Sequence, residues 1–288
     1  MDKDTLRSKI YSKIDELPTL PSTVTRLLAL FEDKRSNASL ITEVIQKDPP
    51  LAAKILKVAN SAYYGFSQKI SDLERAVALL GFNMVKSLAV SIGVMNSVPS
   101  QSKTTVSMKD LWHHSVTVAI LMREMGTRLY NDKGNDHLFV LGLLHDVGVV
   151  VFDQFFSENF QEVLNEVQFI DRRDFYKIEQ RVIGFDHGEV GGMLLTRWNF
   201  PSIISLSVTN HHHNLSEGEE LTKETAMLKL GDIISHSDIQ AEENFEEVDE
   251  ELNPLLQYLE VDDSFINEVL DLRESAKDEI ASFFNAVT

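Results

Sequence analysis

With 288 residues, 43% of them apolar, the chain can bury a substantial core, and without cysteine it can form neither disulfides nor thiolate metal sites. No apolar run reaches the roughly 18 residues that cross a bilayer, and no apolar segment follows the charged N-terminus, which predicts a soluble, cytoplasmic protein without a membrane partner. The net charge is -18, but residues 238–288 hold sixteen Asp/Glu against two Lys/Arg, and no Lys/Arg stripe with interleaved aromatics is present, so nucleic acid is not an expected partner.

Apolar residues recur at helical spacing through nearly every segment, and alternating runs bounded by turn pairs are absent, which predicts an all-α fold. Residues 1–98 are predicted to form an N-terminal helical lobe. Its helices are expected at 22–31, from the Pro49-Pro50 pair to Gly65, from a capping box at Ser71 to Gly81, and at 84–96.

The polar stretch 99–109 marks the boundary to a second predicted lobe over residues 107–237. A long helix is expected from Ser107 to about Tyr130. The next helix, 137–147, is apolar all round and should be surrounded by other helices. Further helices are predicted at 158–167, 175–183, 187–198, 201–212 and 222–236.

The acidic segment 238–288 is predicted to hold a loop and then one amphipathic helix at about 265–284. The apolar face of this helix either packs on its own domain, the favoured alternative, or makes a homo-oligomer contact. Its members are Phe265, Val269, Leu272, Ile280 and Phe284.

Histidines and carboxylates recur where they could share a metal ion. His145 and Asp146 end the buried helix and could flank one ion or bridge two. Alternatively, Asp146 only caps a helix or forms a salt bridge, and His145 is a satisfied core histidine. Asp110 and His114 lie on one helix face, where they could bind one ion. Of the two adjacent histidines we favour His114 over His113 as the ligand. The alternative for Asp110 is that it only caps the helix.

Three later positions extend this pattern. His187 precedes glycines that either allow close helix packing or leave room for a bound group. The run His211–His213 ends a helix, where charged imidazoles gain from the helix dipole, although three in a row exceed that need. Asp232 lies between apolar neighbours and needs a partner if it is buried.

The order of these residues resembles the ligand pattern of HD-superfamily metal phosphohydrolases, especially the HD-GYP branch that hydrolyses cyclic di-GMP. Three N-terminal segments are more specific and closely resemble signatures of the HDOD (HD-related output domain) family: LPTLPSTVTRLLALF, VIQKDPPLAAKILKVANSAYYGF and ISDLERAVALLGFNMVKSLAV. With LWHHS, LLHDVG and HGEVGGMLLTRWNFP, the resemblance extends from Ile14 to His236.

The resemblance implies an HD-superfamily helical domain preceded by a smaller helical lobe. It also implies a bacterial signalling output or scaffold module that acts through protein partners, usually without catalysis. A mono- or dinuclear transition-metal centre is implied, with Fe or Mn favoured over Zn. Its implied ligands are His114, His145, Asp146, His187, His211, His212 and Asp232.

Two departures from the HD-GYP pattern argue against hydrolysis of cyclic di-GMP. The lysine of the HD-x-GK motif is replaced by Val149, and the chain after His213 reads NLSEGEE in place of the GYP-containing motif. The alternative function is a metal-dependent phosphohydrolase acting on a nucleotide or cyclic-nucleotide phosphoester, in which the metal lowers the pKa of the attacking water.

Overall fold

The computed structural model describes residues 3–17, 19–33, 35–130, 136–167, 174–212, 221–236 and 245–287. These residues form α-helices and one short 3-10 helix, with no β-strand among them, which confirms the predicted all-α fold. In chain order the elements are α1 (Lys3–Asp15), α2 (Ser22–Glu32), α3 (Ala38–Gln46), α4 (Pro49–Ala59), η1 (Ala62–Tyr64), α5 (Leu73–Leu80), α6 (Phe82–Ser97), α7 (Met108–Tyr130), α8 (Asp136–Leu144), α9 (Val147–Phe155), α10 (Ser157–Val167), α11 (Phe175–Val182), α12 (His187–Arg197), α13 (Ser202–Asn210), α14 (Lys223–His236), α15 (Phe245–Leu259), α16 (Asp263–Ser275) and α17 (Lys277–Val287).

Short polar side chains cap the first turns of α3, α4 and α5. Asp48 accepts a hydrogen bond from a backbone N–H in the first turn of α4. Asp72 does the same for α5, so Asp72 is the cap where the sequence suggested a capping box at Ser71. Helix α4 ends before the predicted Gly65, which instead ends η1 with a φ of 60°, a conformation that glycine adopts without steric cost.

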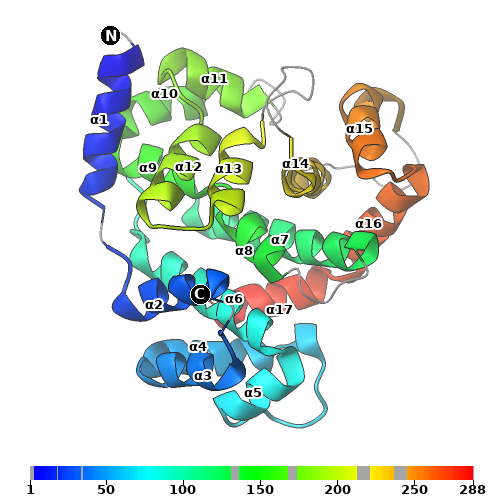
Figure 1. Cartoon of the computed structure of the whole chain (residues 1–288). Helices are drawn as coiled ribbons and strands as arrows, with labels where there is room; N and C mark the ends of the chain where they lie inside the picture. Colours follow the sequence, from blue (N-terminus) through cyan, green and yellow to red (C-terminus); the bar gives the residue numbers. More distant parts are fainter. Residues whose placement is uncertain are drawn as a thin grey trace.

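Helices α2 to α6 form the lower part of the molecule in Figure 1, where α3, α4 and α5 lie against α6. Helix α6 is buried at every residue from Met84 to Val94, because it also packs against α8 of the second lobe. This contact joins the two lobes through their apolar surfaces.

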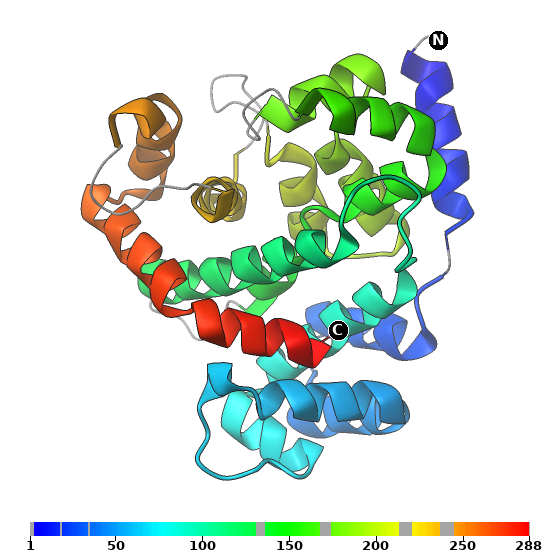
Figure 2. The same ribbon diagram turned by 180° about the vertical axis from the view of Figure 1, so that it is seen from behind.

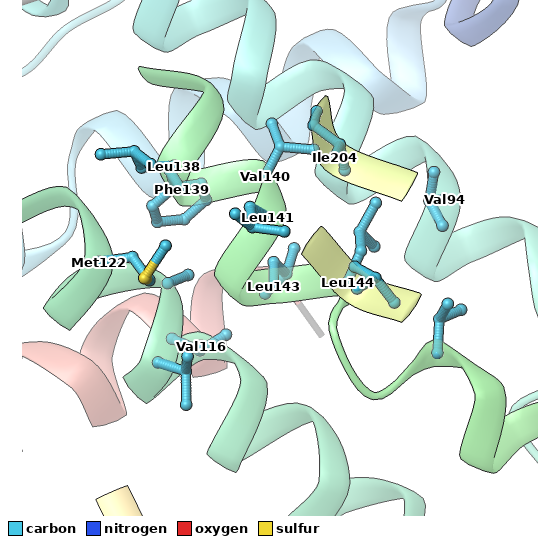
Figure 3. Close-up of a cluster of buried hydrophobic side chains, with 14 of the residues drawn as sticks. Val94, Val116, Met122, Leu138, Phe139, Val140, Leu141, Leu143, Leu144 and Ile204 are labelled. Carbon is cyan, nitrogen blue, oxygen red and sulfur yellow. The ribbon is translucent and has the colours of Figure 1, made fainter. Parts of the chain in front are cut away.

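Helices α7 and α8 pack against each other at the centre of the second lobe. Figure 3 shows Phe139 of α8 beside Met122 of α7. A Cβ on the α8 residue Gly142 would lie 2.6 Å from a backbone atom of α7, so this glycine lets the two helices touch.

The segment predicted as one helix at 137–147 is two helices, α8 and α9, with His145 and Asp146 at the break. Contrary to expectation, His137–Phe155 taken together is long and apolar enough to cross a membrane, but 89% of it is buried inside the structure. The bent pair α5 and α6 meets the same criteria only if counted as one span across a bend of 116°. The burial of His137–Phe155 confirms that other helices surround this segment, as in the core of a soluble protein.

The polar stretch between the lobes is fixed in place by Asp153 of α9, a carboxylate with no solvent exposure. It accepts hydrogen bonds from the hydroxyl groups of Ser102 and Thr104, both at 2.7 Å, and from the backbone N–H groups of Lys103 and Thr104 at 3.0 Å. These bonds hold the path of the chain just before it begins α7.

The two ends of the chain pack on the rest of the molecule. Helix α1 lies along the second lobe in Figure 1, where Asp15 pairs with Nε of Arg197 at 2.6 Å on α12. Within the acidic segment, the described residues 245–287 form three helices, α15 to α17, where one was predicted. Packing of the predicted apolar face on its own domain is confirmed, because Phe265, Val269, Ile280 and Phe284 are buried and Leu272 packs against the core.

Helix α17 connects the two lobes. In Figure 2 it lies between α7 and the first lobe, and it contacts both α7 and α4. Its last turn is capped from α4, where Lys54 Nζ donates to the carbonyl oxygen of Val287 at 2.9 Å and Lys57 Nζ to that of Asn285 at 2.6 Å.

Candidate metal centre

The break between α8 and α9 carries His145 and Asp146. His145 is fully buried, and its Nδ1 lies 2.8 Å from the carbonyl oxygen of Gly142. A carbonyl can only accept, so Nδ1 carries the hydrogen and the lone pair is on Nε2. The Nε2 atom lies 3.2 Å from Oδ1 of Asp146, so both side chains of the pair face one site.

Helix α7 contributes His114, while its neighbour His113 is exposed and packs edge-on against Phe284, with ring centres 5.4 Å apart. The Nε2 atom of His114 lies 3.1 Å from Nε2 of His145. Its Nδ1 lies 3.1 Å from the hydroxyl of Ser235, which donates to a main-chain carbonyl one turn earlier. That hydroxyl therefore accepts from Nδ1 of His114, and the lone pair is again on Nε2.

His187 begins α12, where Asp186 and Glu189 form a reciprocal capping box. Its Nε2 lies 3.1 Å from Oδ1 of Asp146, and its Nδ1 lies 2.6 Å from Oε2 of Glu179. Glu179 is fully buried on α11 and also accepts from the backbone N–H of His187. A carboxylate behind a histidine fixes the ring and makes its ligating nitrogen more basic. Sequence analysis missed Glu179.

His211 and His212 follow α13. His211 is fully buried, donates through Nδ1 to a main-chain carbonyl at 2.6 Å, and places Nε2 4.0 Å from Oδ1 of Asp146. The Nε2 of His212 lies 2.7 Å from Nε2 of His187. His213, the third member of the predicted run, lies outside the described residues.

Helix α14 contributes Asp232 and, one turn later, His236. The Oδ1 atom of Asp232 lies 3.1 Å from Nε2 of His114, 3.6 Å from Nε2 of His145 and 3.4 Å from Nε2 of His236. The ring of His236 stacks on that of His114, with centres 4.1 Å apart, and its side chain is 30% exposed. Sequence analysis missed His236, although its i, i+4 spacing from Asp232 is a usable signal.

Asp146 lies in the middle of this cluster, with Oδ1 facing His145 and His187 and Oδ2 3.4 Å from Nε2 of His114. The structure brings all seven predicted ligands together, and Asp110 is exposed on the wall of the adjoining cavity. The ligand atoms within 4.8 Å of one another form three groups: His114, His145 and Asp232; His145, Asp146 and His211; and His187, His211 and His212.

The hydrogen positions explain why a cation fits between these side chains. Because His114 and His145 both donate through Nδ1, their rings, when neutral, turn two lone pairs towards each other at 3.1 Å, an arrangement that repels unless a proton or a metal cation lies between them. Nε2 of His211 and Oδ1 of Asp232 are also buried without a hydrogen-bond partner. Each such atom costs roughly 1–3 kcal/mol. The nitrogen and oxygen donors therefore fit a transition metal.

Electrostatics favour the metal-binding protonation states of Asp146, His211 and His212. Burial acts to lower the pKa of His145, but the carboxylates of Asp146 and Asp232 raise it, so metal binding at His145 displaces a proton. Burial alone would raise the pKa of Asp146, but the charge of His145 and a hydrogen bond from His187 outweigh it and hold the pKa well below its ordinary value. Burial, with the charges of His187 and His145, lowers the pKa of His211 to about 4, and burial lowers that of His212 as well. Burial also acts to lower the pKa of His187, but its flanking carboxylates raise it well above 6.5, so metal binding there displaces a proton.

The glycines after His187 allow α12 to lie directly on α13. A Cβ on Gly188 would lie 2.9 Å from the carbonyl oxygen of Val208, and one on Gly192 would lie 1.8 Å from Oγ1 of Thr209. Of the two explanations that the sequence left open for these glycines, the structure therefore shows close packing.

A cavity of about 400 Å³ opens over the cluster. Candidate ligands line it, together with apolar side chains of α9, α10 and α11. Val149, at the position of the HD-x-GK lysine, belongs to the apolar part. Lys229 of α14 also lines the cavity. Its ammonium group puts a positive charge in this space, which the sequence did not predict for this helix.

Comparison with known proteins identifies the family. The HDOD domain matches residues 17–214, more than two thirds of the chain. The chain therefore belongs to the HDOD family, as its motifs predicted.

An uncharacterized protein of Treponema pallidum (strain Nichols) is 26% identical over 215 residues, covering 75% of this chain and 41% of the relative. The uncharacterized protein YuxH of Bacillus subtilis (strain 168) is 40% identical over 60 residues, covering 21% of this chain and 15% of the relative. The chain thus spans less than half the length of either relative.

Solved structures share the fold. An HDOD domain protein from Geobacter sulfurreducens superposes with a TM-score of 0.78 at 23% identity, covering 99% of this chain and 97% of that one. A protein from Shewanella amazonensis SB2B, named as a suspected phosphohydrolase, superposes with a TM-score of 0.79 at 22% identity, covering 97% and 98%. At these identities the likeness confirms the all-helical, HD-related fold.

Proposed function

We propose that the chain is a bacterial signal-transduction module whose second lobe holds a mono- or dinuclear transition-metal centre, and that it acts through protein partners without catalysis. Membership of the HDOD family supports the signalling role. The metal centre is supported above all by the facing Nε2 atoms of His114 and His145, each on a ring that donates through Nδ1.

The chain offers ligands for two ions, and Asp146 lies between the two groups of ligands. His114, His145 and Asp232 would hold one ion, with His236 within reach of the same carboxylate. The other would be held by His187, His211 and His212. Imidazole and carboxylate ligands without thiolates suit Fe or Mn, which we favour over Zn.

Metal content of the full chain purified without chelator tests the centre. We expect one or two equivalents of a transition metal by mass spectrometry, with a clear loss in Asp146→Ala and His114→Ala. His113→Ala is the matched control, because His113 is the adjacent residue on the same helix and faces Phe284. Metal-free protein, or equal metal in His113→Ala and His114→Ala, would reject the proposed centre.

The first lobe is the proposed partner-binding part, because it carries the family's most specific motifs and none of the candidate ligands. Leu79 of α5 is 46% exposed there. Proteins retained by the tagged full chain should be lost with Leu79→Arg while metal content stays unchanged. Identical retention by several such first-lobe surface variants would contradict this role.

Metal-dependent phosphoester hydrolysis is the second candidate, favoured by the cavity that opens directly on the cluster and contains Lys229. A bound metal supplies Lewis acidity and lowers the pKa of water. Lys229 would bind a phosphoryl oxygen, and the walls would exclude water. A panel of nucleotides and phosphoesters, tested with metal-loaded wild type and Asp146→Ala, decides the matter: indistinguishable rates reject hydrolysis.

A further inference from the structure

The lining of the cavity over the candidate metal centre is of two chemical kinds. Imidazoles and carboxylates are one kind, whereas Val149, Leu164, Val167 and Phe175 contribute an apolar wall. Helices α9, α10 and α11 supply this wall, and α10 packs against both α9 and α11.

Aromatic rings connect this wall to the candidate ligands. The ring of Phe175 lies against that of His187, with centres 5.7 Å apart and an angle of 32° between the ring planes. The ring of the next residue, Tyr176, is parallel to that of His212 within 2°, with centres 4.7 Å apart. A group bound at the Nε2 atoms of these histidines would therefore lie close to apolar and aromatic surface.

Charge in the cavity is concentrated at the metal centre. Apart from the histidines, the charged side chains among its described lining residues are Asp146 and Asp232 at the centre, Asp110 on the exposed wall, and Lys229. Val149 is 3% exposed and contributes only aliphatic surface. A ligand with charges at both ends would have to place one of them against this wall, which costs free energy.

We propose that the cavity binds a small ligand with one anionic head and an apolar or aromatic body. The head, a phosphate, phosphonate or carboxylate, lies at the metal centre in the cavity that Lys229 also lines, and the body packs against Val149, Leu164 and Phe175. This inference rests on the proposed metal centre. The proposed ligand differs from the multiply charged cyclic dinucleotide of the HD-GYP enzymes, because it has one anionic group and an apolar body.

Calorimetric titration of the metal-loaded full chain with phenylphosphonate and methylphosphonate tests the proposal. The two probes share one head group and differ only in the body. We expect phenylphosphonate to bind at least about tenfold more tightly, as follows when most of a phenyl ring is removed from water. Equal affinities on protein of proven metal content would overturn the inference and leave the metal centre intact.

Two leucine variants locate the binding surface. Leu164→Gln makes the half-buried apolar wall polar and should reduce the preference for phenylphosphonate several-fold, with methylphosphonate affinity and metal content unchanged. Leu206→Gln is the matched control, because Leu206 is 55% exposed on α13 and does not line the cavity. An unchanged preference in a folded Leu164→Gln protein would reject the wall as the binding surface. If the wild-type chain binds no metal, the proposed centre and this inference fail together, and metal analysis distinguishes that outcome.

Discussion

The carbonyl oxygen of His187 occupies the place that a side chain on Gly148 would need. A Cβ on Gly148 would lie 1.9 Å from this oxygen and 2.8 Å from the backbone nitrogen of Gly191. Gly148 is in the first turn of α9 and His187 is in the first turn of α12. The missing side chain thus allows two helices to cross where one carries His187 and the other follows Asp146.

Substituting Gly148 with alanine should therefore damage both the fold and the metal centre. Because the clash is with backbone atoms, we expect a loss of about 1–3 kcal/mol in the free energy of unfolding, together with reduced metal content. Urea unfolding and metal analysis measure the two effects. Gly231→Ala is the control, since its Cβ would meet the flexible end of Met125 at 3.2 Å. Equal behaviour of the two variants would contradict the proposed role of the crossing.

Glu179→Gln should weaken metal binding while preserving the fold. The amide is nearly the same size, but it removes the negative charge that accepts from Nδ1 of His187. Loss of such a partner typically reduces metal affinity 10–100-fold. Competition with a chelator gives the affinity. Glu189→Gln on the capping box of α12 should change stability without a comparable change in affinity, and similar losses in both variants would argue against an orienting role for Glu179.

The metal-free protein should lose stability as acid is added. The pKa of His211 is about 4 in the folded chain against an ordinary value of 6.5. Between these values the unfolded chain binds more protons, so stability falls as the pH decreases from 6.5 to 4. One buried group contributes on the order of 3 kcal/mol to this loss. His236, with a pKa of about 4, acts in the same direction.

Urea unfolding of chelated protein across this pH range measures the slope. His211→Gln should flatten it, whereas an unchanged slope would exclude His211 as a source. The raised pKa of His187 has the opposite sign: its stabilisation is complete below pH 6.5 and is lost as the pH rises through the folded-state value, so it does not enter the acidic range.

Asp153→Ala should release the stretch that leads into α7. The substitution leaves the hydroxyl and N–H groups of residues 102–104 without their buried acceptor, and each bond to a charged group contributes about 1.5–3 kcal/mol. We expect trypsin to cleave after Lys103 in the variant while wild-type protein resists. Equal cleavage would show that other contacts hold this segment.

The sequence was sufficient for the fold class, which depends on local pattern, and for seven residues of the cluster, which the resemblance to HD-superfamily proteins implied. Helical periodicity and capping residues are encoded over a few positions, as at Asp48. The break at His145 and Asp146 was not predicted because the segment is apolar on both sides of it and contains neither a proline nor a glycine at the break. Only packing of α8 on α7 and of α9 on α12 requires the bend.

Glu179 and His236 were not predicted from the sequence, for different reasons. Glu179 belongs to a helix with a charged face, where a glutamate ordinarily contacts solvent, but it is buried here with His187 of α12 as its partner. His236 stands i, i+4 from Asp232, the same spacing that drew attention to Asp110 and His114. That spacing identifies residues on one helix face, but it does not tell which face turns towards the metal cluster.

The break between α8 and α9 places two candidate ligands between two helix contacts. Helix α8 packs on α6 of the first lobe, and α9 packs on α12, which carries His187. If the proposed centre binds an ion, a change in the spacing of its ligands would therefore have only the contact of α8 with α6 between it and the lobe proposed to bind partners.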